Sequence, residues 1–259
     1  ICTGKYVVFW KEFYLSCKEK FLTKSHKEFF VFTDSESLYN EENDLCIHRI
    51  FQKNLGWPGN TLMRFDMFIS QKERIKNFDY IFFINANAEF VCNVTEQEFL
   101  PDTEDIVVVQ HPAFEKTDKY MFPYERRKKS TAYIPYCDGK EYVTGAVNGG
   151  TASAFLDMTE ILANRINVDK KNGITAIWHD ESHLNRYIAY CRSYKLLPPS
   201  NCYTEGYNLG YEPVILMRDK RKYFDVMKFK KNIVYIWLCG LYRHIMYCYM
   251  KTKDLFGDF

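Results

Sequence analysis

The sequence contains no Cys-x-x-Cys pair and no cysteines and histidines at the spacing of a zinc site. Its nine cysteines are an odd number and are scattered along the whole chain. Small secreted domains that depend on disulfides usually carry even numbers of closely spaced cysteines, so this class is disfavoured. We expect reduced thiols in a cytosolic compartment.

A Pro/Gly/Ser-rich linker, an internal repeat and a low-complexity segment are also lacking. The 259 residues are 47% hydrophobic and 17% aromatic, which is enough to bury one large core. We therefore expect one domain. No signal peptide is visible, but the chain begins at Ile1 without a methionine, which is consistent with a missing N-terminal segment.

Neither sign of charge dominates, since 35 Lys and Arg residues stand against 33 Asp and Glu residues. The distribution is uneven. Residues 218–259 hold ten basic and four acidic residues, near +6, which leaves the rest near −4 because the net charge is +2. The basic tail predicts an anionic partner. Nucleic acid is not expected, because the body of the chain is slightly acidic and carries no basic stripe.

No uncharged hydrophobic run is long enough to cross a membrane easily. Residues 233–250 are mostly apolar but are interrupted by Arg243 and His244 near the middle. Lysines flank this run on both sides, and Tyr, Trp and Leu lie between them. The pattern favours an amphipathic helix on an anionic membrane surface. A helix packed on the domain, or on a second copy of the chain, is the alternative.

Strand and helix signals alternate along the first 110 residues. Runs of β-branched and aromatic residues predict buried strands at residues 29–34, 46–51, 80–84 and 106–110. Helical stripes are formed by Phe9, Phe13, Cys17 and Phe21, and by Leu62, Phe65 and Ile69 with Asn60 or Thr61 as N-cap. Further helices are expected after residues 148–150 and 178–181. The order predicts an α/β fold with a mainly parallel central sheet and a ligand beyond the carboxyl ends of its strands.

Two adjacent carboxylates, Asp180 and Glu181, fall in the first turn of one expected helix, after Trp178 and His179. A helix N-terminus keeps a carboxylate ionised and oriented. Such a group can act as a nucleophile or stabilise a positive transition state. Alternatively, Asp180 is only an N-cap and Glu181 a solvated first-turn residue.

Two further stretches each allow a functional and a structural interpretation. Residues 124–135 (YERRKKSTAYIP) include four consecutive basic residues, which form either a solvated face or an anion site. Residues 145–150 (GAVNGG) permit close backbone approach to a ligand. Glycines before a helix often serve only the turn, and the spacing is not that of a phosphate-binding loop.

Five stretches, in this order, carry a resemblance: residues 30–34 (FVFTD), 111–114 (HPAF), 124–135, 145–150 and 177–187 (IWHDESHLNRY). Over about residues 1–222, the sequence resembles the histo-blood-group ABO transferases and α1,3-galactosyltransferases, which are family 6 retaining glycosyltransferases. It is most similar to the bacterial branch, in which Asn-x-Asn replaces Asp-x-Asp. The resemblance implies a GT-A fold, with a single Rossmann-like catalytic domain at 1–222 and a basic, aromatic tail at 223–259.

The resemblance also implies roles for individual residues. Glu181 takes the position of the catalytic glutamate. The donor-binding residues would be Ile1, Cys2, Thr3, Tyr6, Trp57, Arg64, Asn85, Ala86, Asn87, Thr144, Ala146, His179, Asp180, Arg218, Lys220 and Arg221. The acceptor-binding residues would be His111, Phe114, Tyr124, Trp178 and Glu205.

The amides of Asn85 and Asn87 bear on metal use. Amides are poor ligands for Mg²⁺ or Mn²⁺ compared with carboxylates, so we expect no metal and no other cofactor. Cationic side chains, namely Arg64 and those of residues 218–222, are then expected to neutralise the departing diphosphate. The two amides would contact the donor directly, or else cap the strand end through Asx turns.

The expected reaction moves galactose from UDP-galactose to the 3-hydroxyl of a galactose that carries an α1,2-linked fucose, with retention. The methyl group of Ala146 narrows the pocket where an acetamido group would lie, which favours galactose. UDP-N-acetylgalactosamine is the alternative, because Thr144 is an unusual neighbour. The expected setting is a lipid-linked acceptor in bacterial O-antigen synthesis, at the cytoplasmic face of the inner membrane. A remote alternative is an inactive protein that binds glycans or nucleotides.

Overall fold

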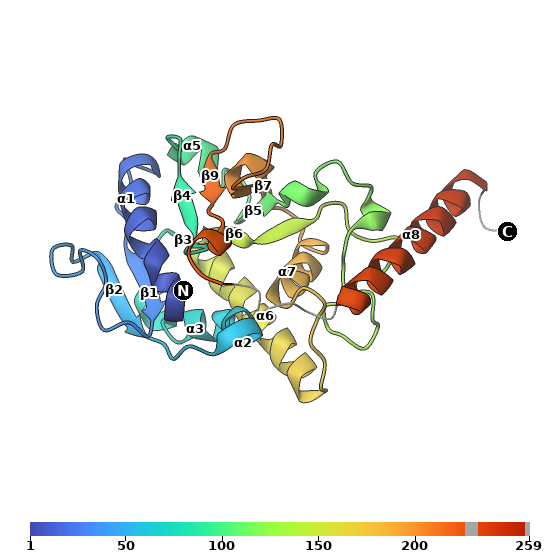
Figure 1. The fold of residues 1–259 in the computed structure, drawn as a ribbon, viewed down its shortest axis with the longest axis horizontal. Helices are drawn as coiled ribbons and strands as arrows, with labels where there is room; N and C mark the ends of the chain where they lie inside the picture. Colours follow the sequence, from blue (N-terminus) through green and yellow to red (C-terminus); the bar gives the residue numbers. More distant parts are fainter. Residues whose placement is uncertain (226–232, 257–259) are drawn as a thin grey trace.

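The structure, a computed structural model, is a mixed α/β protein and describes residues 1–225 and 233–256 (Figure 1). Its strands are β1 (Phe29–Thr33), β2 (Ile47–Phe51), β3 (Tyr80–Ile84), β4 (Ala88–Phe90), β5 (Ile106–Gln110), β6 (Val143–Thr151), β7 (Lys195–Leu197), β8 (Tyr203–Thr204) and β9 (Ile215–Met217). Its α-helices are α1 (Trp10–Lys20), α2 (Gly56–Leu62), α3 (Arg64–Ile69), α4 (Lys72–Ile75), α5 (Glu96–Phe99), α6 (Ala152–Lys171), α7 (Asp180–Ile188) and α8 (Ile233–Phe256). Its 3₁₀ helices are η1 (Gly4–Phe9), η2 (Pro112–Phe114), η3 (Lys119–Met121), η4 (Pro199–Cys202) and η5 (Lys220–Lys222).

The described strands form three sheets rather than one. β1 pairs with β2, the largest sheet has the order β3-β6-β5-β7, and a small sheet has the order β4-β9-β8. β6 runs antiparallel to both of its neighbours, so the prediction of a mainly parallel central sheet is wrong. The pattern of residues 145–150 gave no strand signal, and hydrophobic periodicity reports a strand without its direction.

The glycines near the end of β6 serve strand packing. A Cβ atom on Gly149 would lie 2.2 Å from the Phe82 ring of β3, and one on Gly150 would lie 2.0 Å from the carbonyl oxygen of Asp105, just before β5. Either contact would push the strands apart. These two glycines therefore serve strand packing, a structural role other than the turn that was expected for them.

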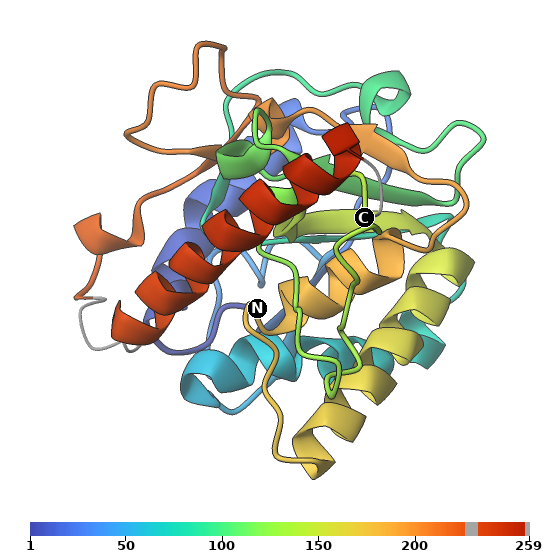
Figure 2. The ribbon, with the colours of Figure 1, turned by 90° about the vertical axis from the view of Figure 1, so that its right-hand side faces the viewer.

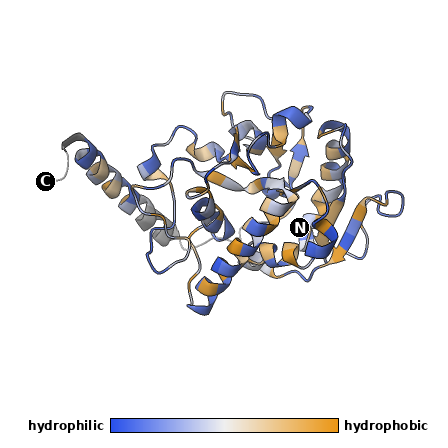
Figure 3. Ribbon diagram, turned by 180° about the vertical axis from the view of Figure 1, so that it is seen from behind, coloured by the Kyte–Doolittle hydropathy of each residue, from blue (hydrophilic) through white to orange (hydrophobic). Residues whose placement is uncertain are grey.

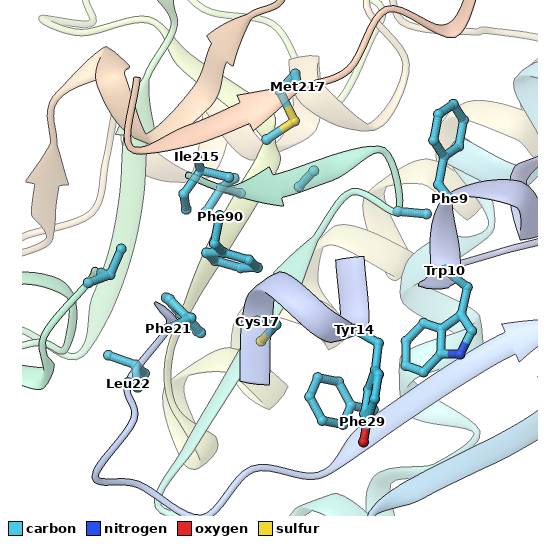
Figure 4. Close-up of a cluster of buried hydrophobic side chains, with 14 of the residues drawn as sticks. Phe9, Trp10, Tyr14, Cys17, Phe21, Leu22, Phe29, Phe90, Ile215 and Met217 are labelled. Atoms are coloured by element: carbon cyan, nitrogen blue, oxygen red, sulfur yellow. The ribbon is translucent and has the colours of Figure 1, made fainter. Parts of the chain in front are cut away.

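Two apolar clusters cover the two faces of the largest sheet. Along β5, Val107 and Val109 belong to the cluster that includes α1, whereas Ile106 and Val108 belong to the cluster that includes α3, α6 and α7. This is the alternation expected of a strand that is buried on both faces. Figure 4 shows part of the first cluster, in which side chains of α1 lie against β1 and β4.

The helix predictions are mostly confirmed, because α1, α3, α6 and α7 coincide with the expected stripes. The predicted N-cap is wrong: Asn60 and Thr61 lie inside α2, and α3 begins after Met63 without a side-chain cap. The hydroxyl of Thr61 donates to the carbonyl of Pro58, and Asn60 accepts from the backbone of Leu55. Both polar side chains are thus used within the preceding turn.

The long connection from β5 to β6 forms a separate lobe with its own apolar cluster of Phe122, Tyr124, Ile134 and Tyr142. Within this lobe Arg126 donates to the carbonyls of Ile134 and Pro135, and Arg127 pairs with Glu125. The first two residues of the basic run are therefore structural, which neither interpretation anticipated.

The C-terminal helix α8 crosses this lobe (Figure 2). Lys251 lies 2.8 Å from Asp118, and the hydroxyl of Tyr120 donates to Asp254. In the part of the chain that the structure describes, no helix is long and apolar enough to cross a membrane. All eight cysteines with described side chains carry free thiols.

Candidate active site

The two carboxylates at the start of α7 are held by different partners. Glu181 accepts hydrogen bonds from the Tyr142 hydroxyl at 2.9 Å (Oε1) and from the Gly145 backbone N–H at 2.7 Å (Oε2). Burial raises the pKa of Glu181, although these two donors and Arg64 oppose the shift. Because both oxygens are fixed, the alternative of a solvated first-turn residue is wrong.

Asp180 is buried and forms an ion pair with Arg64, with 3.1 Å between Oδ2 and Nη1. The same Arg64 nitrogen donates to the Gly145 carbonyl, and the guanidinium lies 4.4 Å from the centre of the Phe83 ring. Burial outweighs the attraction of Arg64 and raises the pKa of Asp180 from 3.8 to about 6. Two predicted donor residues are thus brought together at the carboxyl end of β3.

Gly145 is the point at which these groups converge. A Cβ atom there would lie 3.3 Å from the Cβ of Glu181 and 3.4 Å from Oδ2 of Asp180. A Cβ at this position would be a tight fit, so a side chain here would require the first turn of α7 to shift by a few tenths of an ångström. This first glycine thus lies at the carboxylates, and the ligand interpretation of the motif stays a prediction for it.

Two residues that the sequence reasoning missed orient Glu181. Tyr142 donates to its carboxylate, and Asn185 bridges α7 to β6 through both backbone groups of Val143 and the carbonyl of Glu181. Asn185 lies four residues after Glu181, so it shares a helix face with it. That spacing was the one available sequence signal, because Tyr142 meets Glu181 only through the fold.

The predicted acceptor residues lie around Tyr142. The rings of His111 and Phe114 are 5.7 and 4.9 Å from the ring of Tyr142, and Phe114 and Trp178 pack against the cluster of this lobe. We call His111, Phe114, Tyr142 and Trp178 the aromatic wall. Tyr124 is buried behind it, with its hydroxyl bonded to the Glu141 carbonyl, so a direct contact with the acceptor is not supported.

His111 is a neutral hydrogen-bonding group. Burial lowers its pKa to about 4, so it is uncharged at neutral pH. Its Nδ1 accepts from the backbone N–H of Ala113, which places the proton on Nε2. The Nε2–H is therefore the group that can donate to an acceptor hydroxyl.

The N-terminal residues lie at the carboxyl end of β1. The Cys2 N–H donates to the Phe32 carbonyl and the Thr33 hydroxyl to the Cys2 carbonyl, both at 2.7 Å. The Gly4 N–H donates to Asp34 at 2.6 Å. These contacts place the predicted nucleotide-binding strip, which comprises Ile1, Cys2, Thr3 and Tyr6, beside the end of a strand.

The segment of residues 218–224 packs over this strip. The ring of Tyr6 lies 5.3 Å from that of Phe224, and Nζ of Lys220 lies 5.2 Å from the centre of the Tyr6 ring. Arg218 is buried, and its guanidinium donates to the Phe9 carbonyl. Arg218 thus anchors the segment, and Lys220 has no carboxylate partner among the described residues.

The other predicted residues of this segment are paired with acids. Arg221 binds Asp219, and Lys222 lies 2.5 Å from Glu205, which also accepts from the Asp219 N–H. Glu205 therefore holds the segment in place. Its role in binding an acceptor stays a prediction.

The Asn-x-Asn pair ties β3 to this same segment. Nδ2 of Asn87 donates to the Arg218 carbonyl and the Arg218 N–H to the Asn87 carbonyl, both at 2.9 Å. The backbone N–H of Asn85 donates to the Ala146 carbonyl. In the described residues, Oδ1 of Asn87 has no hydrogen-bond partner, and no group of three or more His, Cys, Asp or Glu side chains could hold a metal ion. Two amides without a carboxylate do not fit a hard divalent cation.

The residues that would select the sugar lie next to Glu181. The Thr144 hydroxyl accepts from the Ala146 N–H at 3.1 Å and lies 3.7 Å from the thiol sulphur of Cys202. Across the site, Trp57 and His179 meet edge to face with 4.8 Å between ring centres. His179 has a φ of 55°, which residues other than glycine rarely adopt and which is common at functional sites.

The sequence model of Glycosyltransferase family 6 matches residues 1–228. The chain belongs to glycosyltransferase family 6. This confirms the resemblance of the sequence motifs to that family. Glycosyl transfer is therefore the chemistry that the family assigns to this chain, while the roles of the carboxylates, the nucleotide-binding strip and the aromatic wall stay predictions.

Curated members of family 6 align with most of this chain. The O-antigen biosynthesis glycosyltransferase WbnI of Escherichia coli is 35% identical over 222 residues, which cover 86% of this chain and 93% of that protein. Globoside alpha-1,3-N-acetylgalactosaminyltransferase 1 of Homo sapiens is 32% identical over 76% of this chain and 57% of its own length. Histo-blood group ABO system transferase 1 of Rattus norvegicus is 31% identical over 75% and 57%. The chain thus spans little more than half of the two longer relatives.

Proposed function

We propose that this family 6 glycosyltransferase moves galactose from UDP-galactose to the 3-hydroxyl of a fucosylated galactose, with retention of the anomeric configuration. The fold would be of the GT-A type, with residues 1–222 as the catalytic domain and 223–259 as the tail. The observation that carries the proposal is the Glu181 carboxylate, which is fixed by Tyr142 and Gly145 between the donor residues and the aromatic wall. An inactive binding protein would have no use for a carboxylate held in this way.

Retention requires the acceptor oxygen to take the face that UDP leaves. The bond from the anomeric carbon to the phosphate oxygen breaks, and UDP departs with the bonding electrons. In one route Glu181 forms a glycosyl ester that the acceptor then displaces; in the other it stabilises the oxocarbenium-like state while the acceptor attacks the same face. In both routes the hydroxyl proton leaves with the UDP phosphate or solvent. Glu181 must be ionised for either.

The charge on departing UDP would be met by side chains instead of a metal ion. Lys220 lies over Tyr6 beside the nucleotide-binding strip and is free of carboxylates among the described residues, so it suits a phosphate. The positive charge of Arg64 offsets the negative charge of Asp180, so this pair leaves the donor side of the site close to neutral. Carboxylates in place of Asn85 and Asn87 would repel a diphosphate that carries no metal.

The choice of galactose rests on Ala146. Its methyl group occupies space that the acetamido group of N-acetylgalactosamine would need, and overpacking costs about 1–3 kcal/mol. The competing donor is UDP-N-acetylgalactosamine. It is favoured by the activity that the name of the Homo sapiens relative states, and by Thr144, an unusual neighbour whose hydroxyl contacts the Ala146 N–H and the Cys202 thiol and so shapes this part of the pocket.

The acceptor is proposed to be a lipid-linked glycan of a bacterial O-antigen, at the cytoplasmic face of the inner membrane, in line with the name of the Escherichia coli relative. Four apolar side chains of α8, those of Leu241, Tyr242, Ile245 and Tyr249, are 46–58% exposed. Their spacing places them within one stripe of the helix, and polar positions interleave with apolar ones along α8 (Figure 3). We place this stripe on an anionic membrane, which would bring the acceptor lobe to the lipid surface.

A donor and acceptor screen tests the proposal. The purified protein is offered UDP-galactose or UDP-N-acetylgalactosamine, each with 2'-fucosyllactose or lactose. We expect turnover with UDP-galactose and 2'-fucosyllactose, and Glu181→Ala should lose nearly all of it. Faster turnover with UDP-N-acetylgalactosamine would establish the competing donor. No turnover with either donor would contradict the proposed substrates.

A further inference from the structure

A second cavity, of about 640 Å³, lies at the end of α7 that is farther from Glu181. Its walls are residues 137–141, which lead into β6, and residues 188–194, which lead out of α7, together with Lys119 of η3. We call it the lobe cavity. None of the described residues that line it belongs to the donor site or to the aromatic wall. Its volume falls within the range of about 300–1,000 Å³ that is usual for small-molecule sites.

The lobe cavity is lined mainly by polar groups. Among the described residues that line it, only Ile188 and Ala189 have purely aliphatic side chains. The walls carry both signs of charge, in the side chains of Lys119, Asp138, Lys140, Glu141 and Arg192. An apolar ligand would leave these groups without hydrogen bonds, and the two acids would repel a polyanion. A ligand with many hydroxyl groups and little net charge fits this lining best.

Tyr190 gives the cavity a fixed aromatic surface. Its side chain is 50% exposed, yet its hydroxyl donates to Asp138 and its ring centre lies 3.8 Å from the Arg186 guanidinium. These two contacts fix the direction of the ring. A ring that is already fixed can bury the C–H groups of a sugar at little cost in side-chain entropy.

Glu141 adds a hydrogen-bond acceptor that the fold does not use. Its backbone carbonyl accepts from the Tyr124 hydroxyl, but among the described residues its carboxylate receives no hydrogen bond. Burial raises the pKa of Glu141, although the charge of Lys140 opposes the shift. A partly buried carboxylate without donors is costly, and a ligand hydroxyl would remove that cost.

The lobe cavity and the aromatic wall rest on the same apolar cluster. Gly139 has a φ of 84°, and a Cβ atom there would lie 2.5 Å from the ring of Tyr124. Ala189, on the opposite wall of the cavity, also packs against this cluster. The loop of residues 137–141 is thus held against the lobe that carries the predicted acceptor residues.

We propose that the lobe cavity binds a stretch of neutral oligosaccharide at a distance from the reacting carboxylates. The inference rests on the proposed function, because an enzyme that extends a glycan meets such chains at every turnover. Two sources supply this chemistry: the sugars of the acceptor beyond the reacting galactose, and a separate glycan chain. The first is favoured by Lys119, since its neighbour Tyr120 bonds Asp254 of α8, the helix proposed to lie on the membrane.

Isothermal titration calorimetry with defined glycans tests the proposal without requiring turnover. The first arm compares 2'-fucosyllactose with lacto-N-fucopentaose I, a pentasaccharide that ends in the same fucosylated galactose. We expect the wild type to bind the pentasaccharide roughly tenfold more tightly, as one or two additional polar contacts would give. Tyr190→Ala should remove this preference and leave the affinity for 2'-fucosyllactose unchanged.

The second arm identifies the source of the chain. Lacto-N-tetraose, the same chain without fucose, is titrated into protein saturated with 2'-fucosyllactose. Binding that Tyr190→Ala abolishes would show that a separate glycan occupies the lobe cavity. A pentasaccharide preference without such binding would assign the cavity to the acceptor itself.

Two further variants serve as controls. Tyr190→Phe keeps the ring, so it should retain most of the preference for the pentasaccharide. Tyr39→Ala removes another partly exposed tyrosine, 44% exposed and outside the lobe, and should behave as the wild type.

Equal affinities for the two fucosylated glycans, together with no binding of lacto-N-tetraose, would overturn the proposal. So would a preference that is the same in Tyr190→Ala as in the wild type. Failure of the proposed function is seen separately, as absent turnover of 2'-fucosyllactose.

Discussion

The hydroxyl of Tyr142 links the aromatic wall to the carboxylate of Glu181, although a ring in this position would pack equally well without it. A hydrogen bond to a charged group contributes about 1.5–3 kcal/mol. Tyr142→Phe should therefore lower kcat about 10- to 100-fold and leave the KM for the donor nearly unchanged. Steady-state kinetics with both substrates measures this.

Tyr124→Phe is the matched control for that variant. It removes a hydroxyl from the same cluster, but one that bonds the Glu141 carbonyl and not Glu181. The control should keep kcat within a few-fold of the wild-type value. Equal losses in the two variants would show that the cluster, and not the bond to Glu181, sets the rate.

Asp180 gives the site a pH dependence. Its pKa is raised to about 6, so its ion pair with Arg64 is fully formed only above that pH. We expect kcat/KM to rise with pH through about 6 and then level off, and Asp180→Asn to show a smaller rise, because only Glu181, whose pKa is also raised and which must be ionised, then remains. A wild-type profile that is flat from pH 5 to pH 8 would contradict the assignment.

The contribution of Asp180 to the stability of the fold should fall as pH rises, whereas kcat/KM should rise. The pKa of this carboxyl is higher in the folded chain than its ordinary value of 3.8, so between 3.8 and about 6 the unfolded chain has already released the proton that the folded chain keeps. The difference in unfolding free energy between the wild type and Asp180→Asn should therefore fall as pH rises through this window. Urea unfolding at several pH values measures it.

Residue types predicted part of this site. Asp180 and Glu181 were identified because acids in a first turn have a direct chemical meaning, whereas Arg64 was identified through the resemblance to the family. The contributions of Tyr142 and Gly145 depend on how closely β6 approaches α7, which the residues of either element alone do not reveal. The resemblance to a family implied which positions belong to the site, but it did not imply which hydrogen bonds connect them.

At the scale of elements, the buried carboxylate of Glu125 anchors the loop that leads to Trp178, one of the predicted acceptor-binding residues. Glu125 accepts from the backbone and side chain of Arg127 and from the N–H of Ile177, next to Trp178. Glu125→Gln weakens these charged bonds, so it should lower the unfolding free energy by about 2–4 kcal/mol. Exposed Lys129→Gln, two residues past Arg127, should change it by less than about 0.5 kcal/mol. Urea denaturation of both variants measures these changes. Equal changes in unfolding free energy would contradict the anchoring role of Glu125.

The helix α8 is the second element with a testable role. Leu241→Asp combined with Ile245→Asp places charge in the exposed stripe, so the protein should no longer sediment with anionic phospholipid vesicles. Turnover of soluble 2'-fucosyllactose should persist, because neither residue touches the site. A control change at a polar position of the same helix, Thr252→Ser, should still bind. Undiminished sedimentation of the Asp variant would exclude the stripe as the membrane contact.

Elements were predicted better than their arrangement. The stripes of α1, α6 and α7 are fixed by local periodicity, and they appeared where expected. The direction of β6 was not predictable, because residues 143–151 mix small and polar residues that are buried between two strands and carry no alternation. Strand pairing depends on contacts between segments that are far apart in the sequence, and a local pattern does not encode these contacts.

For the whole molecule, the central claim is that fixed side chains, and not a bound ion, receive the charge of departing UDP. The amide of Asn87 binds the backbone of Arg218, and the segment of residues 218–224 thereby lies against the nucleotide-binding strip with Lys220 toward Tyr6. This arrangement brings positive charge to the site by folding alone. On this proposal, no carboxylate pair is needed at the end of β3.

The most direct test is the turnover of UDP-galactose with 2'-fucosyllactose by protein dialysed against EDTA and assayed in its presence. We predict the same rate as in buffer with Mn²⁺, because Asn85 and Asn87 offer amides where a cation needs carboxylates. A rate that vanishes in EDTA and returns when Mn²⁺ is added in excess would contradict this claim.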